Sequence, residues 1–162
     1  MKKFISLVLI FTTLNALSQN YSELKSIKLD DSLQCKNAEK KVLECSDYLL
    51  STPCVENLKN LNACQFIIEW MEKTPDYTFG FDDAVYKSIK SDVILSGVYL
   101  ASQSKIAIVE KPRSTDINFK IKYVKMFLEY CEKPENKVKL SSKIKKLIAA
   151  KNEGKLKEAL SK

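Results

Sequence analysis

Apolar residues recur at steps of three and four along most of the chain after residue 32, which is the spacing of one face of an α-helix. A first helix carries its apolar stripe at Cys35, Ala38, Val42, Cys45 and Leu49. The sequence Ser51-Thr52-Pro53 ends it, because proline disfavours helical geometry in the residue before it. A second helix carries a stripe at Cys54, Leu58, Leu61, Cys64, Ile68 and Met71. A connection this short predicts that the two helices lie antiparallel.

The rest of the chain repeats this pattern. Residues 82–90 predict a short helix, and residues 92–110 predict a longer one that is apolar nearly all round from Val93 to Ala101. This longer helix is expected to be the central buried one, with Gly97 allowing a neighbour to approach closely. A fifth helix has its stripe at Ile117, Ile121, Val124, Leu128 and Cys131. A sixth opens at Ser141 or Ser142 and breaks at Gly154. Together they predict an all-α fold, an antiparallel helical bundle of five or six helices.

The first eighteen residues have the features of a cleaved signal peptide. Two lysines precede an apolar run from Phe4 to Phe11, and Ala16-Leu17-Ser18 is a small-x-small cleavage site. The run is shorter than the ~20 residues that span a bilayer, and no cysteine for a lipid anchor follows the cleavage site. We expect an exported protein, periplasmic or secreted, with a signal peptide at 1–18. A flexible segment at 19–32 and a single helical domain at 33–162 would follow. The alternative is a buried first helix.

The stretch from Glu69 to Asp83 combines the only tryptophan with a turn signal and alternating aromatic residues. Thr74-Pro75-Asp76 suits the end of a helix followed by a tight turn. The aromatic residues after it alternate with small ones, as in an extended segment. One interpretation is an aromatic clamp across a helix–helix crossover. The other is a ligand groove whose candidate binding residues are Trp70, Asp76, Tyr77 and Phe79.

Two strings, one near the middle of the chain and one nearer its end, resemble a known group of proteins. They are Trp70-Met71-Glu72-x-Thr74-Pro75-Asp76-Tyr77-Thr78-Phe79 and Leu128-x-Tyr130-Cys131-Glu132-x-Pro134-x-Asn136. Both are similar to strings in a group of small, uncharacterised exported helical proteins of bacteria. The resemblance runs from about residue 45 to residue 160. It implies an exported helical protein and carries over no catalytic or binding residue.

The residue types needed for most enzyme chemistry are missing. The chain contains no histidine and only three glycines, which removes histidine-based nucleophile pairs, histidine zinc sites and glycine-rich phosphate loops. No CxxC pair is present. The remaining candidates are carboxylates such as Glu69 with Glu72, or Asp82 with Asp83, and such acids usually cap helices or face water. We expect no enzyme, no cofactor and no metal site.

Positive charge gathers at the end of the chain. The net charge is +7, and residues 137–162 carry nine lysines against two glutamates. The body of the protein is therefore nearly neutral, which argues against nucleic-acid binding. Ile144, Leu147 and Ile148 form an apolar stripe among these lysines. This basic C-terminal helix either completes the bundle or contacts an anionic membrane surface.

Four cysteines have a regular spacing. Cys35, Cys45, Cys54 and Cys64 are spaced C-x9-C-x8-C-x9-C, which resembles the twin Cx9C hairpin of the coiled-coil-helix-coiled-coil-helix family. The resemblance implies bridges between Cys35 and Cys64 and between Cys45 and Cys54, each adding ~2–4 kcal/mol. The helix end at Pro53 places the turn late for this pairing, and all four positions also suit buried free thiols. Cys131 is expected to be a buried free thiol in either case.

An export signal, missing catalytic residues and exposed helical faces together predict a non-catalytic interaction or structural module of the cell envelope. Its protein partner is not named by any motif. Three alternatives belong to other classes. One is a periplasmic inhibitor or immunity-type protein, and another is a small-molecule binding protein with a pocket lined by Trp70, Tyr77 and Phe79. The third is a carboxylate-based hydrolase that uses Glu69 or Asp76.

Overall fold

The computed structural model of the chain describes residues 21–80, 84–111 and 117–161. Every regular element within these ranges is a helix, which confirms the all-α prediction. The predicted signal peptide lies outside the described residues. The elements are η1 (Ser22–Ser26), α1 (Ser32–Ser51), α2 (Leu58–Lys73), α3 (Ala84–Lys87), α4 (Val93–Glu110), α5 (Ile117–Glu132), η2 (Pro134–Asn136), α6 (Ser142–Asn152) and α7 (Leu156–Leu160).

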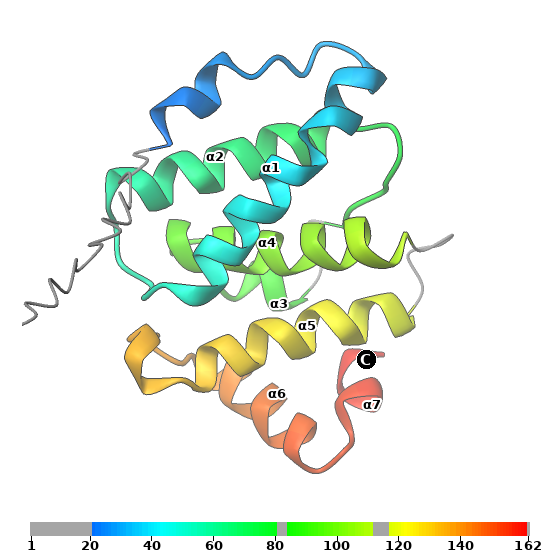
Figure 1. The fold of residues 1–162 in the computed structure, drawn as a ribbon. Coiled ribbons are helices and arrows are strands. Elements are labelled where there is room, and N and C mark those ends of the chain that lie inside the picture. The colour runs from blue at the N-terminus through cyan, green and yellow to red at the C-terminus, as the bar shows by residue number, and fades with distance from the viewer. Residues whose placement is uncertain (1–20, 81–83, 112–116, 162) are drawn as a thin grey trace, which may run out of the picture.

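Helices α1 and α2 form the first layer, and the chain reverses direction between them (Figure 1). Each begins at a side-chain cap: Asp31 Oδ1 accepts from the Gln34 backbone N–H at 2.8 Å, and Asn57 Oδ1 accepts from the Asn60 N–H at 2.9 Å. Such caps satisfy amide groups that the first helical turn leaves unpaired. All five positions of the stripe predicted for the first helix are buried, which confirms its inward face.

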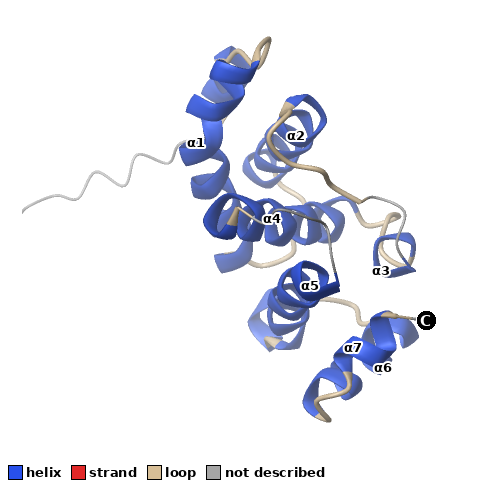
Figure 2. Cartoon of the chain, turned by 90° about the vertical axis from the view of Figure 1, so that its right-hand side faces the viewer, coloured by secondary structure: helices blue, strands red, loops and turns tan. Residues whose placement is uncertain are grey.

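Helix α4 is the centre of the molecule, as the sequence predicts. It contacts α1, α2 and α5, and in Figure 2 it lies between the α1–α2 pair and α5, with α6 and α7 beyond. By length and composition α4 resembles a membrane-spanning helix, but 78% of it is buried inside the protein. Gly97 lies against Cys64 of α2, so closely that a Cβ at position 97 would fall 2.0 Å from the Cys64 Sγ. The expected close approach at Gly97 is confirmed.

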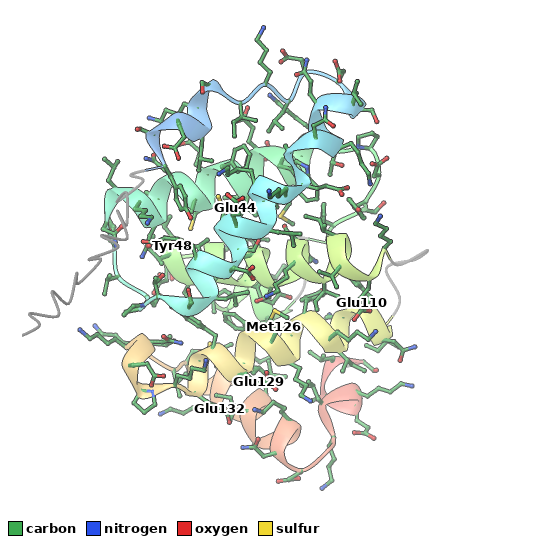
Figure 3. All side chains as sticks on the ribbon, in the orientation of Figure 1. Glu44, Tyr48, Glu110, Met126, Glu129 and Glu132 are labelled. Carbon is green, nitrogen blue, oxygen red and sulfur yellow. The ribbon has the colours of Figure 1, made fainter. Side chains whose placement is uncertain are left out.

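The basic C-terminal helix is packed onto the bundle. Ile144 and Leu147 of α6 and Leu156 of α7 are buried. Glu132, labelled in Figure 3 at the end of α5, forms an ion pair with Lys151 and accepts from Asn152 Nδ2 at 3.3 Å. The turn between α6 and α7 contains Gly154 at φ +71°, where glycine is favoured. Two of the three apolar residues of the predicted stripe are therefore buried in the bundle, and the third, Ile148, is partly buried.

Two segments differ from their predictions. Within the segment expected to be flexible, Tyr21, Leu24 and Leu29 are buried, and η1 packs on α2. Tyr21 also meets the Tyr48 ring edge-on at 5.2 Å, so apolar anchors fix this part of the chain to the bundle. The short helix expected at 82–90 covers only Ala84–Lys87 among the described residues, and the chain from residue 88 to the start of α4 forms turns.

The inward face of α2 was predicted wrongly. Cys64 and Met71 are buried as expected, but Leu58 is 62% exposed and Leu61 and Ile68 are only half-buried. The core face of α2 contains residues 63, 64, 67, 70 and 71, together with Asn60, which is buried and donates through Nδ2 to the Val55 carbonyl at 2.7 Å. Leu61 and Ile68 lie at the edge of the core, and Leu58 faces outward.

Candidate functional site

The predicted binding stretch comes together as a structural cluster. Trp70 is fully buried, and its Nε1–H donates to the Cys35 carbonyl at 2.9 Å. The rings of Tyr77 and Phe79 lie 5.7 and 5.8 Å from the Trp70 ring, and 6.2 Å from each other. Such distances are typical of packed aromatic side chains. The geometry is that of a clamp that fastens the chain after α2 onto α1.

The polar groups of this cluster are paired with α1. The Tyr77 hydroxyl donates to Glu39 Oε1 at 2.9 Å. Asp76 lies 3.7 Å from the Lys36 ammonium, which also forms an ion pair with Glu39 at 2.8 Å. Burial and the Glu39 carboxylate raise the pKa of Tyr77 to about 12, so the phenol stays neutral. Three of the four candidate binding residues, Trp70, Asp76 and Tyr77, thus already have partners within the chain.

Phe79 lines a hollow of about 250 Å³ formed by residues that the structure describes. Its other lining residues are Thr78, Gly80, Gln103, Phe119, Lys120 and Tyr123. Trp70 and Tyr77 are not among them. Gly80 directly precedes residues 81–83, which lie outside the described part of the chain. The small-molecule alternative therefore rests on Phe79 and its neighbours, not on Trp70.

All five cysteines are free thiols in the structure. The implied pairing of Cys35 with Cys64 is not present. Cys35 lies opposite Trp70, and Cys64 packs onto Gly97 of α4. Cys54 lies in the α1–α2 connection, where its N–H donates to the Asn136 carbonyl at 2.9 Å. The turn between the helices is centred several residues later than the twin Cx9C pairing requires, because α2 begins only at Leu58.

The thiols are poor nucleophiles at neutral pH. Burial raises the pKa of Cys45, Cys64 and Cys131 to about 12 and that of the half-buried Cys54 to about 11. The reactive species is the thiolate, which these values make scarce. Among the described residues, no three His, Cys, Asp or Glu side chains are grouped to hold a metal ion. The buried cysteines therefore act as small apolar side chains.

Raising the pH from about 7 to about 10 is expected to lower the free energy of unfolding. The folded protein keeps thiol protons that the unfolded chain releases, since burial holds the pKa of Cys45, Cys64 and Cys131 near 12 against an ordinary 9.0. This stabilisation is fully present below about pH 9 and is lost as the pH rises through 9 towards 12. Urea midpoints measured by circular dichroism at the two pH values check it.

A Cys45→Ala variant is the control for the alkaline effect, and its midpoint should fall by less between the same two pH values. Because the chain has no histidine, the midpoint should be nearly constant between about pH 6 and 8. Equal midpoints at about pH 7 and 10 would contradict the burial of the thiols.

The outer face of α2 forms the other candidate site. Leu58, Leu61, Gln65, Ile68 and Glu72 follow each other at steps of three and four, so they share one stripe of the helix. A hollow of about 580 Å³ lies along this stripe. It is lined by Leu61, Cys64, Gln65, Ile68, Glu69, Glu72 and Val93. Its apolar part is formed by α2 and by the first residue of α4.

A second hollow continues the first. It measures about 340 Å³ and is lined by Cys54, Glu56, Ser91, Asp92, Val93 and Ile94. Val93 lines both hollows and is 56% exposed, although the sequence places it in the buried helix. We call the two hollows together the acid-rimmed groove. Every charged residue that lines it is acidic, namely Glu56, Glu69, Glu72 and Asp92.

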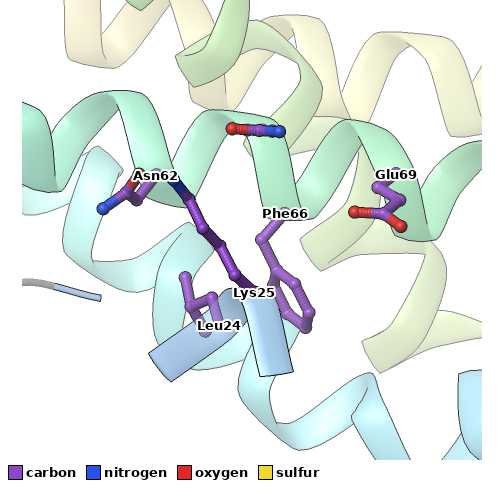
Figure 4. Close-up of a pocket in the computed structure, with 6 residues that line it drawn as sticks. Leu24, Lys25, Asn62, Phe66 and Glu69 are labelled. Atoms are coloured by element: carbon purple, nitrogen blue, oxygen red, sulfur yellow. The ribbon is translucent and has the colours of Figure 1, made fainter. Parts of the chain in front are cut away.

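A third, much smaller hollow lies on the other side of Gln65 and Glu69. Figure 4 shows it between Leu24 and Lys25 of η1 and Asn62 and Phe66 of α2. Its volume is about 20 Å³, which is far below the roughly 300 Å³ at which organic ligands are usually bound. This hollow lies between η1 and α2, and it is too small to bind an organic ligand.

The acid-rimmed groove is the site that reasoning from sequence missed. The signal was present, because α2 carries apolar residues in two phases: Ala63, Ile67 and Trp70 in one, and Leu58, Leu61 and Ile68 in the other. A helix that packs on one side needs only one phase of apolar residues. Comparison of the chain with models of protein families, with curated proteins and with solved structures gave no match.

Proposed function

We propose that this chain is an exported, non-catalytic interaction module of the cell envelope that binds a protein partner along the acid-rimmed groove. The observation that carries the proposal is the outer stripe of α2. Leu58, Leu61 and Ile68 occupy one line of the helix. The bundle leaves Leu58 exposed and Leu61 and Ile68 partly buried at the edge of the core. Apolar surface rimmed by polar residues is typical of protein interaction sites.

The arrangement of the groove supports a protein ligand better than a small molecule. It is open, and it runs between two helices instead of closing into a pocket. Leu58 begins the stripe beside the groove and lines neither hollow, and from Leu58 to Glu72 the stripe covers 14 residue steps, about 21 Å at the helical rise. That length suits a segment of a folded partner. An inhibitor or immunity-type protein would use such a surface in the same way, by occupying its target.

Export and the absence of catalysis rest on the sequence. The signal-peptide pattern of residues 1–18 supports an envelope location. The chain lacks histidine, and its thiols are held protonated by burial, so the common nucleophile chemistries have no residues to perform them.

Site-specific photo-crosslinking tests the docking surface. A photoreactive phenylalanine analogue is placed at Leu58 in one variant and at Leu33 in the other, in cells that make the protein. These leucines are 62% and 68% exposed, and each lies in the first turn of its helix. The control position at Leu33 thus matches Leu58 in residue type, exposure and helix position.

The expected result is one dominant crosslinked protein from position 58 and none from position 33. Equal crosslinking from both positions would contradict the proposal, as would none from either. A product that contains only two copies of this chain would also contradict it, because the groove would then be a self-association surface.

A further inference from the structure

We infer that the segment bound in the acid-rimmed groove is an amphipathic helix with basic residues at both ends. The inference rests on the proposed function and adds the chemistry of the partner. It follows from two features of the groove, the spacing of its apolar residues and the sign of its charges.

The spacing of the apolar residues favours a helical partner. Leu58, Leu61 and Ile68 follow the three- and four-residue steps of a coiled-coil seam along α2, with the polar Gln65 at the step between Leu61 and Ile68. A second helix fits such a stripe because its own side chains enter the spaces between consecutive turns. Val93, at the start of α4, closes one side and gives the partner helix a second apolar contact.

The charges of the groove favour a basic partner. The chain as a whole is strongly positive at +7, yet no lysine or arginine lines either hollow. Glu72 makes no ion pair in the described ranges of the chain. Glu69 pairs with Lys73 at 2.8 Å, but both side chains are exposed. Exposed pairs are weak, so a partner's lysine or arginine can replace Lys73 at little cost.

The acidic residues lie at both ends of the groove. Glu56 and Asp92 line the hollow beside the start of α2, and Glu69 and Glu72 line the one that extends towards its end. Asp92 also accepts from the Leu95 N–H at 2.9 Å as the cap of α4, which leaves its second oxygen for a partner. The apolar stripe lies between these carboxylates. A matching helix is about 14 residues long, with lysine or arginine in its first and last turns.

Binding of synthetic peptides tests this inference on the purified full chain. The probe is a helical peptide of about 15 residues with leucines at steps of three and four and lysines at both ends. A second peptide replaces each lysine by glutamate. We expect the lysine peptide to bind at least about ten-fold more tightly, with an affinity that falls as salt is added.

Matched variants show whether the groove is responsible. Glu69→Lys combined with Glu72→Lys should weaken binding of the lysine peptide by about ten-fold or more. Glu129→Lys on α5 is the control, since Glu129 is an exposed glutamate with a lysine partner at 4.0 Å. Val93→Lys should also weaken binding, whereas Val109→Lys should not. Val109 is 62% exposed on the same helix, 16 residues away. Circular dichroism confirms that each variant is folded.

The outcomes separate the inference from the proposed function. Equal binding of both peptides, or an effect of Val93→Lys without one of Glu69→Lys and Glu72→Lys, would overturn the basic partner. So would crosslinking at position 58 without binding of the lysine peptide. In each of these cases only the basic character of the partner would be overturned, and the proposed docking surface would not be contradicted. If neither peptide binds and position 58 gives no crosslink, both the inference and the proposed function fail.

Discussion

Replacing Gly97 by alanine is expected to lower the free energy of unfolding by about 3 kcal/mol. Two effects oppose each other at this position. Alanine is the better helix former by about 1 kcal/mol, but its Cβ would lie 2.0 Å from the Cys64 Sγ and 2.9 Å from the Cys64 Cβ. Contacts this short force α2 and α4 apart through much of the core, so the loss of packing outweighs the gain in helix propensity. Urea unfolding followed by circular dichroism measures the difference.

Two further variants locate the cause of this loss. Gly80→Ala is the matched control, because nothing lies within 4 Å of a Cβ at that position, and it should change stability by less than about 0.5 kcal/mol. Adding Cys64→Gly to Gly97→Ala removes both clashing atoms and should recover part of the loss, as a positive coupling energy. A Gly97→Ala protein as stable as the parent would show that α2 and α4 do not meet here.

Replacing Trp70 by alanine is expected to cost about 3–5 kcal/mol. The side chain is fully buried, and it joins α2 to α1 through its hydrogen bond to the Cys35 carbonyl. It is also the ring on which Tyr77 and Phe79 pack. Removing it leaves a cavity that three segments surround and cannot all fill. The measurement is again the unfolding free energy from urea.

Trp70→Phe separates the ring from its hydrogen bond. Phenylalanine keeps most of the apolar volume and loses the N–H donor, so we expect a loss of about 1–2 kcal/mol. Tyr77→Phe removes only the bond to Glu39 and should cost about 1 kcal/mol. A Trp70→Ala protein that loses less than about 1 kcal/mol would contradict the structural role and return Trp70 to the candidate ligand residues.

Much of the fold follows from hydrophobic spacing alone. The stripe of the first helix was predicted residue by residue, because it is the one unbroken apolar stripe of the helix. The other leucines, Leu33, Leu43 and Leu50, are separated by charged residues. Helix α4 was placed at the centre because it is apolar nearly all round. Its predicted range, 92–110, differs by one residue from the observed Val93–Glu110. In such segments the spacing of the apolar residues is sufficient to predict which residues are buried.

The α2 face could not be chosen from spacing, because both phases are apolar. The phase that contains Ala63, Ile67 and Trp70 is the one that is buried where α2 packs on α1 and α4. This choice depends on contacts with helices far along the chain, which spacing within α2 does not encode. The groove was missed for the same reason, since it exists only where the outer stripe of α2 meets the exposed start of α4 at Val93.

Trp70, Tyr77 and Phe79 show that a correct grouping does not fix a role. The sequence indicated that these aromatic residues come together, and they do. It did not show that α1 would supply the Cys35 carbonyl to Trp70 and the Glu39 carboxylate to Tyr77. With those partners in place, the stretch closes the core, and the surface left for a partner lies on the opposite side of α2.

The two faces of α2 place different demands on natural variation. Positions 63, 67, 70 and 71 are committed to the core, so descendants of this chain can change them only together with their neighbours in α1 and α4. Positions 58, 65 and 72 are exposed on the same helix, so substitutions there need not disturb the fold, whereas Leu61 and Ile68 still contact the core. A lineage can therefore exchange one partner for another most readily by changing the exposed side chains. Divergent relatives would then share the inner positions of α2 and differ at the outer ones.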